Sequence, residues 1–139
     1  MPVRTQDLEA VAPMLATFDV QQSAAVDQLK DANIGQPVML TAGNEVGPIV
    51  TDGQLLGKLI DLTLSDGDDG KRLATVQIGG ICRLPISATF PVVGNRVVGG
   101  AGGPVKQAPT VAADPAGGNI ARGTVLAVNG TVDCTILLN

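Results

Sequence analysis

The C-terminal stretch Thr124-Val-Leu-Ala-Val-Asn-Gly-Thr-Val-Asp-Cys-Thr-Ile-Leu-Leu138 decides the fold class of this chain. Its two apolar runs are rich in Val, Leu, Ile and Thr, and they flank the dipeptide Asn129-Gly130. Asn and Gly both tolerate a positive φ, so this dipeptide is the strongest short signal for a β-hairpin. We therefore predict two antiparallel strands, at residues 124–128 and 131–138, joined by a two-residue turn.

The same pattern extends upstream from this hairpin to Gly35. Short apolar runs alternate with turn signals, among them Asp52-Gly53 and the Gly-rich stretch 99–103. Strands at intervals of about 8–12 residues are typical of an all-β sandwich or barrel. We predict an all-β fold: a small antiparallel β-barrel or sandwich of about eight to ten short strands, with an extended N-terminal arm. The upstream strands are expected at residues 37–41, 47–51, 55–64, 73–78, 81–87, 92–98 and 104–107. Gly79-Gly80 allows a bend between the strands 73–78 and 81–87, and Gly94-Asn95 breaks the strand 92–98.

The N-terminal part of the chain does not follow this pattern. Because Pro13 interrupts any helical apolar stripe, residues 1–17 are predicted to form a flexible arm. Residues 18–139 are predicted to form a single β-barrel or sandwich domain. At its start, residues 18–34 are ambiguous between a short helix capped by Ser23 and a strand.

The composition excludes several classes of function. The 139 residues include no His, Trp or Tyr and two Phe. Without His, the usual general base near neutral pH and the Ser-His-Asp triad are missing, and two Cys cannot complete a four-ligand zinc site. A net charge of −4 gives no basic surface for nucleic acid, and no apolar run is long enough to span a membrane. We predict a chain that is not an enzyme, with no catalytic, cofactor-binding or metal-binding residues and no nucleic-acid or membrane partner.

Both cysteines lie in strand-like alternation. Cys82 shares a face with Leu84, and Cys134 shares a face with Val132 and Ile136. We therefore predict that both are small buried apolar residues, while a disulfide or a reactive thiol remains the alternative.

One position conflicts with simple alternation. In the predicted strand 55–64, Ile60 and Leu62 share a face, and Lys58 falls in the same register. We favour a β-bulge at Gly57 that resets the alternation; a position at the sheet rim with a buried stem is the alternative for Lys58.

A series of motifs in the second half of the chain is similar to a known family. The series runs Ala-Thr-Val-Gln-Ile-Gly-Gly-Ile-Cys-Arg-Leu-Pro-Ile-Ser (74–87), Val-Gly-Asn-Arg-Val-Val (93–98), Val-Lys (105–106) and a final hairpin ending in Leu-Leu-Asn (137–139). In this order it resembles the small head-decoration, or capsid-cement, proteins of tailed bacteriophages. With Gly-Gln-Pro-Val-Met-Leu and Leu-Gly-Lys-Leu-Ile further upstream, the resemblance covers about residues 35–139. Asn95 stands where the family often has Asp, which removes a charge and keeps the turn chemistry.

The resemblance implies a structural phage virion protein that binds the outer surface of the assembled capsid and stabilises it. The implied partner is the major capsid protein, the implied state is a homo-oligomer with a trimer favoured, and the implied location is the capsid surface after synthesis in the bacterial host cytoplasm. A generic β-barrel spacer or binding module of a phage tail, baseplate or other surface assembly is the alternative; an acid-pair hydrolase would need a cleft with two facing carboxylates.

The N-terminal arm carries the residues expected to meet the partner. Apolar side chains near a free chain end can order on docking, against the capsid or a neighbouring subunit. The expected contact residues are Val3, Leu8, Val11, Leu15 and Phe18.

Overall fold

The computed structural model describes residues 11–63, 72–109 and 122–138, and it confirms the all-β fold. Within these ranges there are eleven strands and one short 3-10 helix, and no helix is long and apolar enough to cross a membrane. The elements are β1 (Val11–Val20), β2 (Gln22–Ser23), β3 (Val26–Asp27), η1 (Asp31–Asn33), β4 (Pro37–Ala42), β5 (Glu45–Pro48), β6 (Gly57–Leu62), β7 (Leu73–Pro85), β8 (Val97–Gly99), β9 (Val105–Gln107), β10 (Thr124–Asn129) and β11 (Asp133–Leu138).

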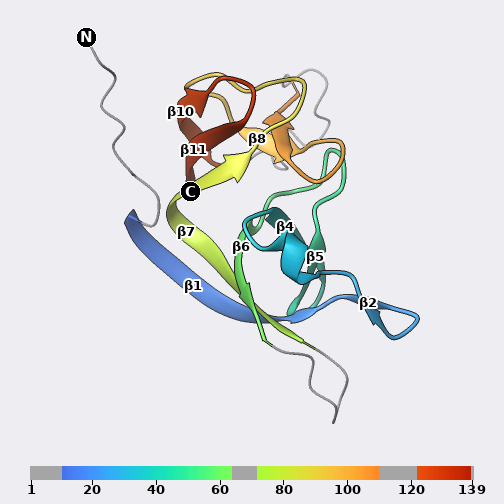
Figure 1. Cartoon of the computed structure of the whole chain (residues 1–139). Helices are drawn as coiled ribbons and strands as arrows, with labels where there is room; N and C mark the ends of the chain where they lie inside the picture. Colours follow the sequence, from blue (N-terminus) through green and yellow to red (C-terminus); the bar gives the residue numbers. More distant parts are fainter. Residues whose placement is uncertain (1–10, 64–71, 110–121, 139) are drawn as a thin grey trace.

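Five strands form a closed barrel in the order β1-β5-β4-β6-β7, and β1 returns to pair with β7 (Figure 1). The β1–β5 pair is parallel and the other pairs are antiparallel. Closing the ring removes the exposed sheet edges that otherwise promote aggregation. The barrel core consists of Val20, Leu29, Val38, Val46, Leu59, Leu62, Ala74 and Val76.

The long strand β7 joins the barrel to a second half of the molecule. Its first part pairs with β1 and β6, and its last part pairs with β11, which forms a hairpin with β10 (Figure 1). The bend expected at Gly79-Gly80 lies inside one continuous strand, where Gly80 has a φ of +86°. The second core consists of Ile49, Leu55, Cys82, Leu84, Ile86, Val97, Val105, Val125, Cys134, Ile136 and Leu138.

The structure differs from the expected flexible arm over residues 11–17. These residues form the first part of β1, which pairs with β7 from Val11 opposite Ile81 to Asp19 opposite Leu73. The barrel closes only through this pairing, so the strand is specified by a distant segment. Pro13 is accommodated because the register shifts on both sides of Met14, and a bulge tolerates a residue without an N–H.

The ambiguous segment after β1 contains no α-helix in the described residues. Ser23, expected as a possible helix cap, lies in the two-residue strand β2, which pairs with β3. Ala24 and Ala25 both have positive φ, of 53° and 64°, and form the turn between these strands. Two consecutive positive φ values are typical of a tight hairpin turn, which explains the loss of the helical alternative.

The bulge in β6 exists, but it lies at Ile60 and not at Gly57. The register with β7 shifts between Leu59 and Asp61. The extra residue lets Leu59 and Leu62 both face the core and leaves Ile60 exposed. Strict alternation had placed Ile60 on the same face as Leu62. Lys58 is therefore half-buried, outside the core face.

The C-terminal hairpin is present, and its turn is one residue longer than expected. Asn129 pairs with Asp133, so three residues form the turn, and Gly130 adopts a φ of +56°. The longer turn takes Val132 out of the strand, and its side chain is exposed. It does not share the buried face of Cys134, as alternation had predicted.

Candidate interaction surface

The expected contact residues are only partly within the described structure. Val3 and Leu8 lie outside the described residues. Val11 is the first residue of β1, and its backbone lies opposite Ile81 of β7.

Leu15 and Phe18 lie on opposite faces of β1. Leu15, opposite Gln77, points outward and is 53% exposed. Phe18, opposite Ala74, is half-buried and packs against the barrel core. Residues three apart on a strand point to opposite faces, so the strand offers Leu15 to a partner and uses much of Phe18 for its own packing.

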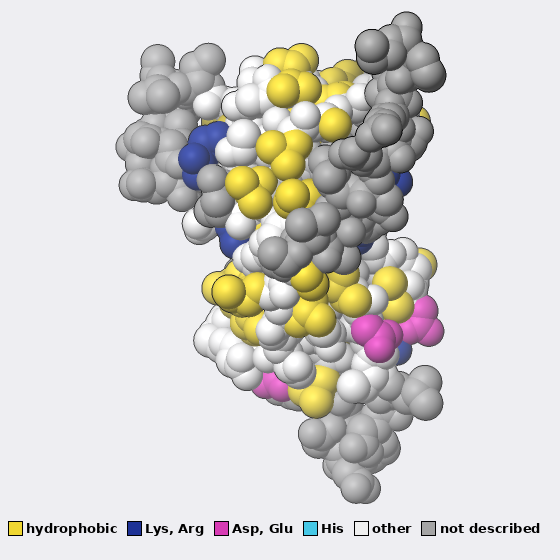
Figure 2. Space-filling view, turned by 90° about the vertical axis from the view of Figure 1, so that its left-hand side faces the viewer, with side chains coloured by type: hydrophobic (Ala, Val, Ile, Leu, Met, Phe, Trp, Pro, Cys, Tyr) yellow, Lys and Arg dark blue, Asp and Glu magenta, His cyan; other side chains and the backbone are white. Residues whose placement is uncertain are grey.

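Met14, which the sequence analysis did not select, adds to the outward apolar surface of β1. The register shifts around Met14 leave both it and Leu15 exposed, with Met14 at 62%. Gly79 lies opposite Met14, and a Cβ at Gly79 would lie 3.1 Å from the Met14 Cβ. The side of the molecule that carries β1 is turned to the viewer in Figure 2, which shows apolar side chains gathered in a band across it.

A second apolar surface is the turn Val92–Asn95, here called the valine turn. Val92 and Val93 are 60% and 65% exposed. The N–H of Val92 donates to Asn95 Oδ1 (2.8 Å), and the N–H of Asn95 donates to the Val92 carbonyl (3.0 Å). Gly94 supplies the required positive φ of 91°. The turn therefore holds two neighbouring valines toward solvent in one fixed conformation.

The valine turn is also hydrogen-bonded to the edge strand of the sheet. The N–H of Gly94 donates to the Val125 carbonyl (2.8 Å), and the N–H of Val125 donates to the Asn95 carbonyl (2.9 Å). Val125 lies in β10, the last strand of the sheet, and the register of β10 shifts at Leu126. A covered and bulged edge is poorly suited to accept another strand, so we expect this region to contact partners through side chains.

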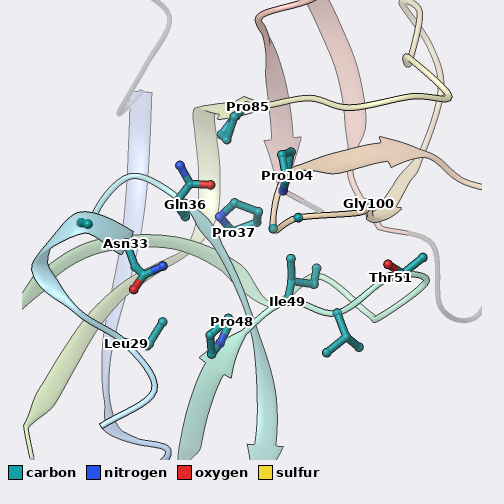
Figure 3. A pocket seen from close by; sticks show the side chains of 14 residues that line it. Leu29, Asn33, Gln36, Pro37, Pro48, Ile49, Thr51, Pro85, Gly100 and Pro104 are labelled. Atoms are coloured by element: carbon teal, nitrogen blue, oxygen red, sulfur yellow. The ribbon is translucent and has the colours of Figure 1, made fainter.

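A cavity of about 660 Å³ lies between η1, the β4–β5 hairpin and the loop that joins β8 to β9 (Figure 3). Among the described residues, its lining contains no Asp, Glu, Lys, Arg or Cys. Backbone, prolines and aliphatic side chains form its walls, and the polar side chains are Asn33, Gln36 and Thr51.

The two cysteines are free and buried in the second core, as predicted. Cys82 lies opposite Ile136 and Cys134 lies opposite Leu84, so the two thiols are diagonal neighbours on adjacent strands. Burial, with smaller contributions from Cys82 and Asp133, raises the pKa of Cys134 to about 12, so its thiol stays protonated near neutral pH. Among the described residues, no group of three or more Cys, Asp or Glu could hold a metal ion.

The sequence matches no protein-family model, and no curated protein or solved structure is significantly similar to it.

Proposed function

We propose that this chain is a structural phage virion protein that binds the outer surface of the assembled capsid and stabilises it. The single observation that carries the proposal is the valine turn, which presents two exposed valines in a fixed conformation. The motif 93–98, part of the family resemblance, runs through this same turn. Burying a valine side chain is worth about 1.5–3 kcal/mol, and a fixed turn loses little conformational entropy on binding.

A protein that reinforces a shell needs apolar contact area on a rigid scaffold and no titrating groups. If it binds the assembled shell and not the free subunits, it stabilises the shell by mass action. Many copies on one lattice add their contributions. The outward residues Met14 and Leu15 supply a second contact surface on the closed barrel.

The resemblance supplies the remaining parts of the proposal. The partner is the major capsid protein, the bound form is a homotrimer, and the location is the capsid surface of the virion. Val3, Leu8 and Val11 belong to the proposed contact, together with the exposed Leu15.

The test uses the full-length chain and purified capsids that lack it, from the phage that encodes it. We expect the chain to sediment with expanded shells and to raise the temperature at which they rupture. The double variant Val92→Ser, Val93→Ser removes the apolar tip and is expected to weaken binding at least tenfold. Val50→Ser, at another exposed valine, is the matched control and should bind normally.

Two results would count against the proposal. Capsids that do not bind the wild-type chain would exclude the decoration function. Labelling of virions with an antibody to the chain that marks tails or baseplates would support the alternative of a β-barrel spacer.

A further inference from the structure

Arg122 occupies a gap between the barrel and the second core. Its Nη1 donates to the carbonyl of Leu56 and lies 3.4 Å from that of Leu55, and its Nη2 donates to the carbonyl of Ile78. Its backbone forms a bridge to Val97 through hydrogen bonds of 3.0 and 3.1 Å. The guanidinium thus links the segment before β6 to strand β7, and the Arg122 backbone adds a link to strand β8.

The positive charge of Arg122 is not balanced by an acidic side chain among the described residues. Its acceptors are main-chain carbonyls, which carry no net charge. Burial lowers the pKa of Arg122, with an opposing contribution from Cys82. A guanidinium has five N–H donors, and the bonds to these carbonyls use three of them, which leaves two without an acceptor among the described residues.

A cavity of about 380 Å³ opens beside this guanidinium. Besides Arg122, Gln54 is the polar side chain in its lining. This volume falls within the range of pockets that hold small ligand groups. The apolar walls come from Met39, Leu40, Leu55, Leu56 and Ile78.

We propose that this cavity binds a peptide segment of a partner protein in which an acidic side chain neighbours a branched aliphatic one. The carboxylate accepts hydrogen bonds from the remaining N–H donors of Arg122 and neutralises its charge, and such charge-assisted bonds are stronger than neutral ones. The aliphatic side chain fills the space among Met39, Leu40 and Leu56. The charge of Arg122 therefore favours an acidic side chain, and the apolar lining favours an aliphatic side chain next to it. This site is separate from the valine turn and does not depend on the capsid proposal.

The first experiment measures binding of short peptides to the full-length chain by NMR. The probe is acetyl-Ala-Glu-Leu-Glu-Ala-amide, and the amides of Leu56 and Ile78 report on the cavity. Acetyl-Ala-Gln-Leu-Gln-Ala-amide removes the charge and is expected to bind at least tenfold more weakly. Acetyl-Ala-Glu-Ser-Glu-Ala-amide removes the aliphatic group and should also lose most of its affinity.

Variants of the cavity provide the second test. Leu40 is 49% exposed, so Leu40→Glu should fold, and its new carboxylate should pair with Arg122 and abolish peptide binding. Leu126→Glu places the same charge on an exposed β10 residue outside the cavity lining and should leave binding unchanged. Arg122→Lys keeps the charge and loses the forked donor geometry, so it should bind more weakly than wild type.

Three results would overturn the assignment: equal binding of the acidic and amide peptides, unchanged binding by Leu40→Glu, or binding of octanoate without binding of the acidic peptide. A chain that binds the peptide but not capsids would leave this site standing and exclude only the decoration function. A chain that binds capsids but not the peptide would exclude this peptide site and leave the decoration function standing.

Discussion

The barrel and the second half of the molecule share β7, but they pair with it differently. Residues 74–77 of β7 have a paired strand on each side, β1 and β6. Residues 82–85 pair with β11 on one side, and no other strand in the described ranges pairs with them. Backbone hydrogen bonds therefore surround the barrel part of the strand, whereas the second half relies on side-chain packing and on links such as Arg122. We expect the barrel to be the more stable half.

The largest effect on the free energy of unfolding should come from matched core truncations, one in each half of the molecule. Leu59 and Leu84 are both fully buried. Leu→Ala in a core costs about 2–5 kcal/mol, and the cost depends on how far the surroundings collapse into the cavity. We expect Leu59→Ala to lie near the upper end, since a closed ring of strands relaxes little, and Leu84→Ala near the lower end. Urea denaturation measures both, and a larger loss for Leu84→Ala would reverse the proposed order of stability.

An intermediate effect on the free energy of unfolding should appear at alkaline pH, through Cys134 in the second core. The folded-state pKa of Cys134 is about 12, above its ordinary value of 9.0. Above pH 9 the unfolded chain loses this proton while the folded chain keeps it, so stability falls as pH rises from about 9 to 12. The slope for one such group is at most about 1.4 kcal/mol per pH unit.

The comparison of wild type with Cys134→Ala isolates this contribution. Unfolding free energies measured between pH 8 and 11 should show a flatter profile for Cys134→Ala. Thr135→Ala, which alters the neighbouring residue and keeps the thiol, should retain the wild-type slope. Identical profiles for wild type and Cys134→Ala would mean that the thiol is not shielded from water.

The smallest effect on the free energy of unfolding should come from substitutions in the valine turn. Asn95→Ala removes the side-chain acceptor for the Val92 N–H, and the loss of one such bond costs about 1 kcal/mol. Asn95→Asp keeps an acceptor oxygen and should change stability by less than about 0.5 kcal/mol. Hydrogen exchange of the Val92 amide reports the turn directly. Unchanged protection in Asn95→Ala would show that the bonds to Val125 alone fix the turn.

The sequence predicted those parts of the fold that depend on local alternation. The two strands of the C-terminal hairpin and the buried faces of Cys82 and Cys134 follow a period of two residues, and the structure has them. The turns at Asp52 and Gly94 follow from residues that tolerate positive φ, and both residues have it.

The features that were missed depend on bulges or on distant partners. The extra residue at Ile60 changes which side chains of β6 face the core, and the sequence does not mark its position. Gln77 reads as an outward polar position, yet it is buried, and its Nε2 donates to the carbonyls of Gly79 and Ile81. Arg122 offered no local signal, because its acceptors lie more than forty residues away in the chain.

The pairing of β1 with β7 has a consequence for synthesis of the chain. The partners of β1 residues 11–19 are β7 residues 73–81, so during synthesis β1 cannot complete its pairing until most of the barrel has followed. At about 5–20 residues per second, β1 waits several seconds before the barrel covers its Phe18 and Val20 side chains. High contact order also slows the final closure. We therefore expect β1 to be a binding site for chaperones during translation.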